Sequence, residues 1–196
     1  MTSKVSICNM ALANVGKPDI TTIDEDSAEA RACRVYYDQT LAALLEVYPW
    51  RFARRTVAMA EVTNAKPNRW QKAFRRPSDC RKVLIVADED GGDFVPGLLI
   101  GVPYEIEGNT VYCDLDVAYM TFTADQPDPT IYSALFIDAL SWQLTVRLAM
   151  PMTRDSKVRA DAYQLADRMT TTAAVHDANE VRISTDTPSP ILEART

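Results

Sequence analysis

Residues 128–151 have the sequence DPTIYSALFIDALSWQLTVRLAMP, which predicts the central helix of the protein. Asp128 is a favourable N-cap, and Pro129 would then occupy the first helical position, where proline is common. We expect Pro151 to end this helix, because proline interrupts the helical hydrogen bonds. Apolar side chains cover much of its circumference: Ile131, Leu135, Ile137, Ala139, Leu140, Leu144 and Leu148. A helix that is apolar on most sides is buried, so other helices must pack around it.

Two helices are predicted before the central one. Residues 3–16 place several apolar side chains near one face, and Gly16 is typical of a helix C-terminus. Asp26 and Glu29 have the spacing of a capping box, so we expect a long second helix that begins there and runs to about Tyr48.

The composition of the chain changes between the second and the central helix. Strands are predicted at residues 82–87 and 117–123, and a hairpin at 104–113 is predicted around the turn Gly108-Asn109. Residues 64–77 are polar and basic, so they are expected to form a connection rather than a core element. For residues 51–61, a short helix and an extended segment both remain open.

Together these elements predict an α+β fold. Thr153 is expected to cap a last helix that runs to about Val175. We therefore expect a bundle of about four to five helices with a small antiparallel β domain inserted into it and an extended C-terminal tail. The predicted divisions are a helical body, a basic linker plus β insertion, and a flexible tail, at residues 1–63 with 127–179, 64–126 and 180–196, respectively.

Length and composition exclude several classes of protein. The 196 residues are 47% hydrophobic and 24% charged, which suits one folded domain with a sizeable core. No run of about 18 apolar residues is present, so a membrane-spanning protein is not expected. The four cysteines form no C-x-x-C pair and are predicted to be buried free thiols: Cys8, Cys33, Cys80 and Cys113.

Catalytic and metal-binding motifs are missing from the sequence. It has no G-x-S-x-G elbow, no phosphate-binding P-loop and no G-x-G-x-x-G fingerprint, so we expect no enzymatic activity, no cofactor and no metal. A pair of His176 with a cysteine has no local support. The acidic run 88–93 does not match a calcium loop and suits a solvated hairpin tip. Glu105 and Glu107 share one strand face, where a hydrated surface is favoured over acid–base chemistry.

Charge is distributed very unevenly along the chain. The net charge is −6, but residues 51–82 contain ten basic and two acidic residues, whereas residues 83–146 contain eleven acidic and no basic ones. The basic block 50–82 also contains Trp50, Phe52, Trp70 and Phe74. Interleaved cations and rings are used to bind single-stranded nucleic acid, so a nucleic-acid-binding module is the alternative function. In the other interpretation, which we favour, these rings are buried in the hydrophobic core and the basic side chains contact an acidic protein surface.

The two charged blocks could bring copies of the chain together. If they lie on opposite flanks, subunits can associate head to tail, and such contacts close into a ring when the rotation permits. If the blocks face each other within one monomer, this argument fails. The candidate subunit-interface residues are Arg51, Arg54, Arg55, Arg75, Arg76, Glu105, Glu107, Asp114 and Asp116.

Several segments resemble one protein family along most of the chain. The most specific is Tyr48-Pro49-Trp50-Arg51-Phe52-Ala53. The others are Ala11-Leu12-Ala13-Asn14-Val15-Gly16, Ile20, Tyr36-Tyr37-Asp38, Leu44-Leu45, Phe74-Arg75-Arg76-Pro77-Ser78-Asp79-Cys80-Arg81, Tyr104-Glu105-Ile106-Glu107-Gly108-Asn109 and the helix from Phe136 to Ala149. Over residues 3–179 the chain thus resembles podovirus tail tubular protein A, the head–tail adaptor, or connector, of short-tailed bacteriophages. It departs from the family at Leu41, where relatives often have arginine.

The resemblance implies a structural virion protein without a catalytic step. It implies a ring, a dodecamer in the relatives, between the portal protein and the tail nozzle, a tubular protein B-like partner. The helical part would form the ring body, and the β part would project from it. Double-stranded DNA would pass through the lumen without specific binding, which suits an acidic lining. The expected location is the virion tail or neck, after assembly in the host cytoplasm.

The C-terminal tail is the predicted portal-binding segment. Residues 180–196 have few core residues, but their apolar and proline residues suit a segment that orders on a partner. The candidate portal-binding residues are Val181, Ile183, Pro188, Pro190, Ile191 and Leu192. The alternative is that residues 180–196 are a disordered terminus with no binding role.

Overall fold

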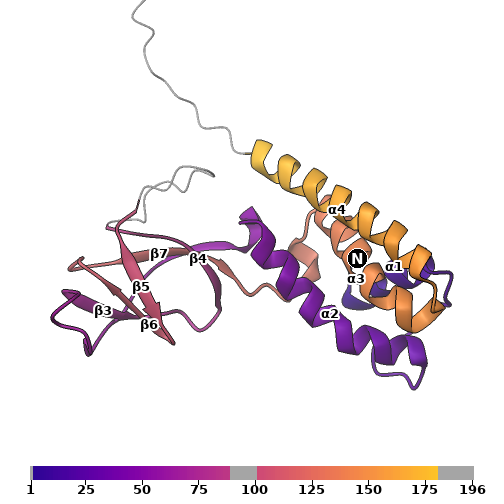
Figure 1. The fold of residues 1–196 in the computed structure, drawn as a ribbon, viewed down its shortest axis with the longest axis horizontal. Coiled ribbons are helices and arrows are strands. Elements are labelled where there is room, and N and C mark those ends of the chain that lie inside the picture. Colours follow the sequence, from indigo (N-terminus) through magenta and orange to yellow (C-terminus); the bar gives the residue numbers. More distant parts are fainter. Residues whose placement is uncertain (1, 89–100, 181–196) are drawn as a thin grey trace, which may run out of the picture.

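A computed structural model describes residues 2–88 and 101–180 and has the predicted α+β architecture (Figure 1). A helical part and a β part lie side by side along the long axis of the molecule. The described residues form four α-helices and two antiparallel sheets. The predicted tail and most of the acidic run 88–93 lie outside the described residues, so the predictions for them stay predictions.

Helix α1 (Lys4–Asn14) begins and ends where its sequence predicts. Ser3 and Ser6 form a reciprocal capping box, in which each hydroxyl oxygen accepts a hydrogen bond from the other residue's backbone N–H, at 3.0 and 2.8 Å. Gly16 follows the helix with φ +68°, a left-handed conformation that costs glycine little. The polar pattern at both ends therefore sets the length of this helix.

Helix α2 (Ala28–Val47) starts one residue later than predicted. Its N-cap is Ser27, whose hydroxyl accepts from the Ala30 N–H at 3.1 Å, so the predicted Asp26–Glu29 capping box is wrong. The Asp26 carboxylate instead pairs with Arg31 at 3.0 Å. Aspartate and serine are about equally good N-caps, and two neighbouring candidates cannot be separated by spacing alone.

Helix α3 (Ala134–Thr153) is the central helix, but both of its predicted ends need correction. Asp128 and Pro129 begin a separate short 3-10 helix, η2 (Pro129–Ile131), and Ser133 is the N-cap of α3. Pro151 lies inside the last turn, and Arg154 ends the helix with φ 56°. Pro151 cannot donate to the Arg147 carbonyl, but the helix continues for only two residues beyond it, so the interruption affects the last turn alone.

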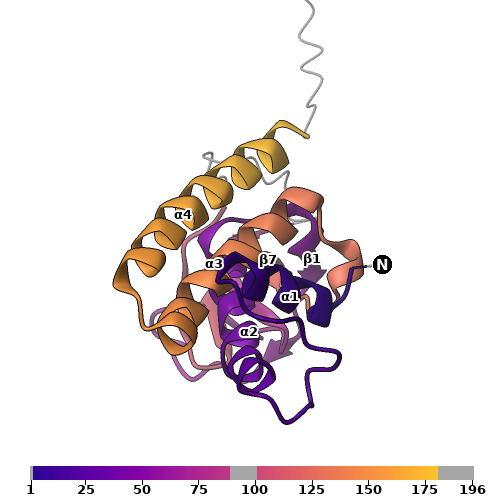
Figure 2. The same ribbon diagram turned by 90° about the vertical axis from the view of Figure 1, so that its right-hand side faces the viewer.

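Helix α4 (Ser156–Asn179) covers α3 on the outside of the helical part (Figure 2). Its N-cap is Asp155, which accepts from the Lys157 N–H at 2.8 Å, whereas Thr153 had been expected in that role. The helix continues four residues past Val175, the predicted end. It buries a stripe of small side chains: Ala162, Ala166, Thr170 and Ala173. Small residues at these positions let the two helices approach closely.

Aromatic side chains close the helical core beside the β part. Trp50 is 1% exposed, and its ring centroid lies 4.9 Å from that of Phe136 and 5.1 Å from that of Tyr48. The Trp50 indole N–H donates to the Leu44 carbonyl at 2.7 Å. Lys82 Nζ donates to the Glu46 carbonyl at 2.9 Å. Two of the last carbonyls of α2 are thereby satisfied without a glycine cap.

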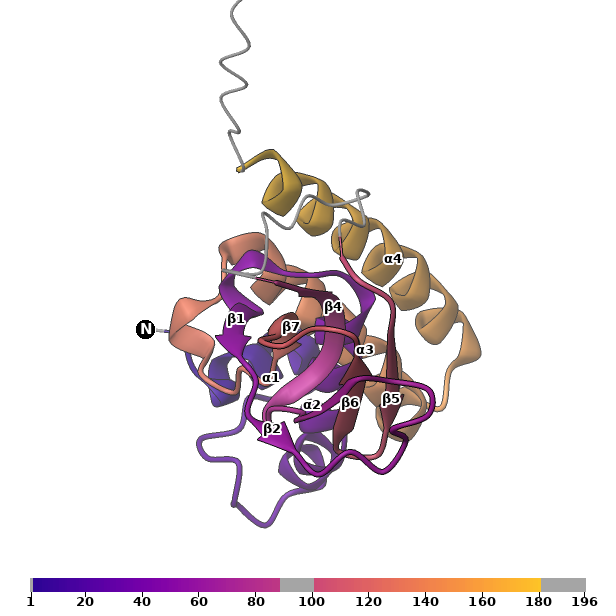
Figure 3. The same cartoon turned by 90° about the vertical axis from the view of Figure 1, so that its left-hand side faces the viewer.

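In the β part, the described residues form seven short strands in two sheets. Figure 3 shows this part from its free end. The three-stranded sheet has the order β1-β7-β4, and the four-stranded sheet has the order β2-β3-β6-β5. The bounds are β1 (Arg54–Ala58), β2 (Glu61–Val62), β3 (Lys72–Arg75), β4 (Cys80–Ala87), β5 (Tyr104–Glu107), β6 (Thr110–Cys113) and β7 (Tyr119–Ala124). Gly108, with φ +57°, and Asn109 form the turn of the predicted β5–β6 hairpin.

The β part begins earlier in the chain than predicted. Strands β1 and β2 pair with β7 and β3, although residues 1–63 had been assigned to the helical body. A short 3-10 helix, η1 (Arg51–Ala53), separates α2 from β1. Residues 64–77 are not only a connection, because β3 lies among them and buries Ala73 and Phe74. Strands of two to five residues carry too few side chains to be recognised without their distant partners.

Each part of the molecule has its own hydrophobic core. One cluster of buried residues lies among the helices and a second lies between the two sheets. All four cysteines are buried and free, as predicted. Among the described helices, none has the length and apolar character required to cross a membrane.

Candidate functional site

Glu105 and Glu107 are held by basic residues of their own chain. Lys66 Nζ lies 2.7 Å from Glu105 Oε1 and 2.8 Å from Glu107 Oε2. Arg69 Nε lies 3.2 Å from the other Glu105 oxygen, which also accepts from the Trp70 indole N–H at 2.9 Å. Hydrogen bonds from Lys66 and Trp70 lower the pKa of Glu105, and the bond to Glu105 raises the pKa of Lys66. A carboxylate held in its charged form in this way is poorly suited to donate a proton near neutral pH.

Other oppositely charged residues also meet within the monomer. Arg55 pairs with Asp79 at 3.0 Å, and Arg51 pairs with Glu180 at 3.4 Å. The Asp114 carboxylate accepts from the Gln71 backbone N–H at 2.9 Å. Asp79 and Glu180 lie outside the acidic block, but the pairs of Lys66 and Arg69 with Glu105 do join the two blocks inside one molecule. Arg81 and Asp125, 3.0 Å apart, form another such pair. Partly exposed pairs of this kind contribute little free energy individually, but they occupy the charges that a head-to-tail contact was expected to use.

The remaining interface candidates differ in their surroundings. The Arg76 guanidinium donates to the carbonyls of Cys80 and Arg81 at 2.7 and 3.0 Å, so it holds the segment before β4. Arg75 and Asp116 are exposed, and neither is in an ion pair within residues 2–88 and 101–180. Arg54 begins β1 and is partly buried. The nine candidates thus differ in exposure and in partners, and their role in a subunit interface stays a prediction.

Three of the four aromatic rings of the basic block pack in the cores: Trp50, Phe52 and Phe74. Trp50 and Phe74 are each 1% exposed, and Phe52 packs edge to face on Phe136 with centroids 4.8 Å apart. The Trp70 indole is bonded to Glu105. Base stacking requires an accessible ring face, which the two buried rings do not offer.

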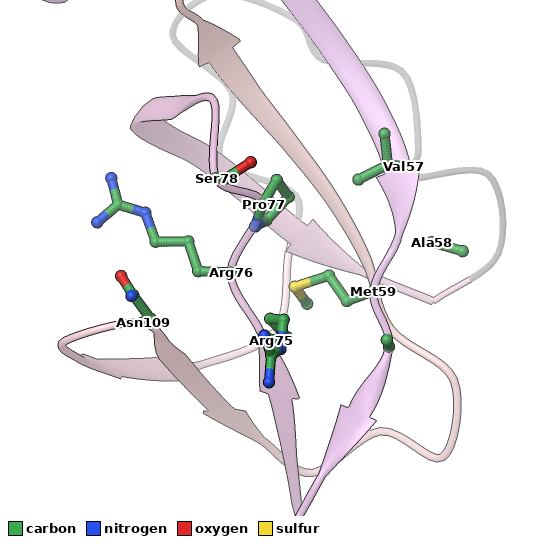
Figure 4. A pocket seen from close by; sticks show the side chains of 9 residues that line it. Val57, Ala58, Met59, Arg75, Arg76, Pro77, Ser78 and Asn109 are labelled. Carbon is green, nitrogen blue, oxygen red and sulfur yellow. The ribbon is translucent and has the colours of Figure 1, made fainter.

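A hollow lies where strand β1 separates from the segment that follows β3 (Figure 4). Its volume is about 460 Å³, and it is lined by Val57, Ala58, Met59, Ala60, Arg75, Arg76, Pro77, Ser78 and Asn109. At its closed end the Arg75 N–H donates to the Ala60 carbonyl at 2.8 Å. On the far side the Arg76 N–H donates to the Asn109 carbonyl at 2.9 Å. Sequence reasoning missed this hollow, because the two walls are about fifteen residues apart in the chain.

The described residues do not form a recognisable catalytic or metal centre. His176 is exposed and lies 3.6 Å from Glu180, whereas the four cysteines are buried. The neighbouring Cys33 thiol and burial raise the pKa of Cys8 far above its usual range, which makes that thiol unreactive. In the part of the chain that the structure describes, no three His, Cys, Asp or Glu side chains are grouped so as to hold a metal ion.

The predicted portal-binding residues lie outside the described residues: Val181, Ile183, Pro188, Pro190, Ile191 and Leu192. A scan of protein-family models found no match to this chain, and a search of curated proteins found no relative. Function must therefore be argued from the residues and their arrangement.

Proposed function

We propose that this protein is a structural head–tail adaptor of a short-tailed bacteriophage. Subunits would form a ring between the portal and the tail nozzle and extend the channel through which DNA passes. The proposal includes no chemical step and no cofactor.

One observation carries the proposal: the segment with the most specific resemblance, residues 48–53, forms the junction between the two parts of the molecule. Trp50 within it is buried in the helical core, and Ala53 is followed directly by β1. A helical body from which a β part projects is the arrangement that the resemblance to tail tubular protein A implies. The most distinctive residues of the resemblance thus have a defined structural role in this chain.

The ring contact needs a surface other than the charges that are paired within the monomer. Apolar side chains on the helical part supply a candidate, because α2 and the end of α3 border a hollow lined mainly by Ala28, Ala32, Val35, Tyr36, Pro151 and Met152. Val35 there is 55% exposed. A subunit contact through the helices agrees with a helical ring body, and exposed apolar patches are typical of such contacts.

The proposal is tested by light scattering on the protein alone and mixed with the portal protein of the same phage, at low and moderate salt. We expect a large assembly in the presence of the portal, because a partner that binds the ring stabilises it by mass action. Val35→Asp should prevent this assembly, whereas the matched variant Val117→Asp should not, since Val117 is 59% exposed on the β part. Deletion of residues 180–196 should abolish portal binding and leave the monomer folded.

The opposite result is equally specific. A protein that stays monomeric with the portal and instead retains DNA in a salt-dependent way would refute the adaptor. Loss of that retention on substitution of Arg54, Arg55, Arg75 and Arg76 would then assign the basic block to nucleic-acid binding.

A further inference from the structure

Strand β1 is the edge of the three-stranded sheet, and its main chain faces outward at alternate residues. It pairs antiparallel with β7, with Thr56 opposite Thr121. Just beyond the strand the Met59 N–H donates to the Ala118 carbonyl at 2.8 Å, in the same register. Since hydrogen-bonded and non-hydrogen-bonded pairs alternate along an antiparallel ladder, the odd-numbered residues bond to β7. The N–H and C=O groups of Thr56 and Ala58 therefore point to the open side, and both residues are exposed.

The hollow beside this edge has the shape of a strand position that residues 2–88 and 101–180 leave empty. The Ala60 carbonyl points to the open side and accepts from the Arg75 N–H, so β3 lies on that side at the closed end. Residues 76–78 then turn away toward Asn109, and the hollow opens between them and β1 (Figure 4). An extended segment placed there would continue the line of β3 along β1. Val57 and Met59 form the apolar wall that its side chains would contact.

The positive charge around the hollow favours an acidic segment as its occupant. Residues 55–60 and 75–79 contain three arginines and one carboxylate, that of Asp79, which is paired with Arg55. Arg75 is exposed at the closed end and forms no ion pair with a described residue. An incoming strand with acidic side chains would meet unbalanced positive charge, which favours it over a neutral or basic one.

We infer that the open edge of β1 and the adjoining hollow bind an extended, acidic segment of a partner protein by strand addition. Main-chain bonds to Thr56 and Ala58 would supply affinity, and Arg75 would supply the preference for acidic sequences. An open edge strand is a template for such pairing unless something blocks it, and β1 has no proline or inward-pointing charge that would do so. The site does not depend on the adaptor proposal, because any partner with such a segment could use it.

The test uses the full chain and labelled octapeptides in a fluorescence anisotropy titration. The probes are the acidic peptide DVTVDVTE, its basic counterpart KVTVKVTK, and DPPPDPPE, whose consecutive prolines remove N–H donors from both edges of a strand. We expect the acidic peptide to bind and to shift the NMR amide signals of Thr56 and Ala58. The basic and the proline peptides should bind at least about tenfold more weakly, the factor expected for the loss of one charge-assisted or main-chain bond.

Matched variants separate strand addition from other binding. Thr56→Pro removes an outward N–H and keeps the main-chain bonds to β7, so it should fold and lose acidic-peptide binding. Thr56→Ala loses the same hydroxyl bond to Thr121 but keeps the N–H, so it should retain binding. Arg75→Glu should weaken binding of the acidic peptide about tenfold. Arg69→Glu changes an exposed arginine outside the hollow and should leave this binding unchanged. If Thr56→Pro does not fold, the Arg75 and Arg69 pair decides the result.

Three outcomes would overturn the inference. The first is no binding of the acidic peptide at millimolar concentration, and the second is equal binding to Thr56→Pro and Thr56→Ala. The third is self-association that Thr56→Pro abolishes in light scattering without any peptide binding, which would assign the edge to a second copy of the chain. The first two outcomes do not bear on assembly with the portal. In the third, Val35→Asp would leave the β1 contact intact, so failure here is distinguishable from failure of the adaptor proposal.

Discussion

Trp50 lies in the segment with the most specific resemblance, residues 48–53, and is also central to the packing of the helical part. Its ring lies between Tyr48, Phe52 and Phe136, and its indole N–H donates to the Leu44 carbonyl at 2.7 Å. That carbonyl belongs to the last turn of α2 and has no later helical residue to pair with. A ring of similar size without the N–H would pack but would leave a buried carbonyl unsatisfied.

We predict that Trp50→Phe lowers the free energy of unfolding by about 1–3 kcal/mol, the usual cost of an orphaned buried polar group. Urea unfolding followed by circular dichroism measures this change. Trp70→Phe is the matched control, because its indole bonds to Glu105 in a partly exposed site and should matter less. Equal losses of unfolding free energy in the two variants would show that the hydrogen bond to the Leu44 carbonyl contributes no more stability than the one to Glu105.

At the scale of the elements, side chains outside the helices decide where the chain turns. The connection between α1 and α2 is organised by Glu25, whose Oε2 accepts from the N–H and the hydroxyl of Thr21, both at 2.8 Å. The Thr22 N–H adds a longer bond at 3.4 Å. These hydrogen bonds favour the ionised carboxylate, and the bond from the Thr21 backbone contributes most to lowering the pKa of Glu25 to about 2.

The sign of the resulting pH dependence follows from this lowered pKa. A carboxyl with a lower pKa in the folded state stabilises the fold above its unfolded pKa of about 4.5, and this contribution is lost as the pH falls toward about 2. We predict that Glu25→Gln lowers the urea midpoint at pH 6 and that its difference from the unmodified chain shrinks steadily below pH 4.5. A difference that stays constant down to pH 2 would contradict this role of the carboxylate.

At the scale of the whole molecule, the β part is an insertion whose ends lie side by side. Arg54 at the start of β1 pairs with Thr123 near the end of β7, so the chain leaves and re-enters the helical part at neighbouring points. The two hydrophobic clusters are separate. The Lys82–Glu46 bond is one of the links between the parts beyond the two connections. Parts with separate cores and few shared contacts are expected to fold independently.

We predict that replacing residues 54–124 by a short Gly-Ser linker leaves a helical part that unfolds cooperatively. The ends of the linker have to span only about 5 Å, the separation of paired residues in an antiparallel sheet. Circular dichroism would measure retention of the helices. The fluorescence of Trp50, recorded with Trp142→Phe so that Trp50 is the remaining tryptophan, would measure retention of the aromatic cluster. A gradual, non-cooperative transition would show that the helices depend on the sheets.

Local patterns were sufficient for features that depend on neighbouring residues. The apolar circumference of α3, the left-handed Gly16 and the Gly108-Asn109 turn were all predictable, because each involves interactions within a few positions of the chain. Helix ends were less certain by one to a few residues, since adjacent residues such as Asp26 and Ser27 have similar capping ability.

The partners of the charged residues and the edges of the sheets could not be predicted in this way. Lys66 and Glu105 are 39 positions apart, and Ala60 and Arg75 meet only because β2 pairs with β3. The sequence by itself determined the helices, the hairpin, the free thiols and the opposite signs of the two blocks. Only the tertiary structure decided that the blocks meet within one molecule and that β1 is left open beside a hollow. The physical reason is that charge pairing and strand order depend on which distant segments the packing of two separate cores brings together.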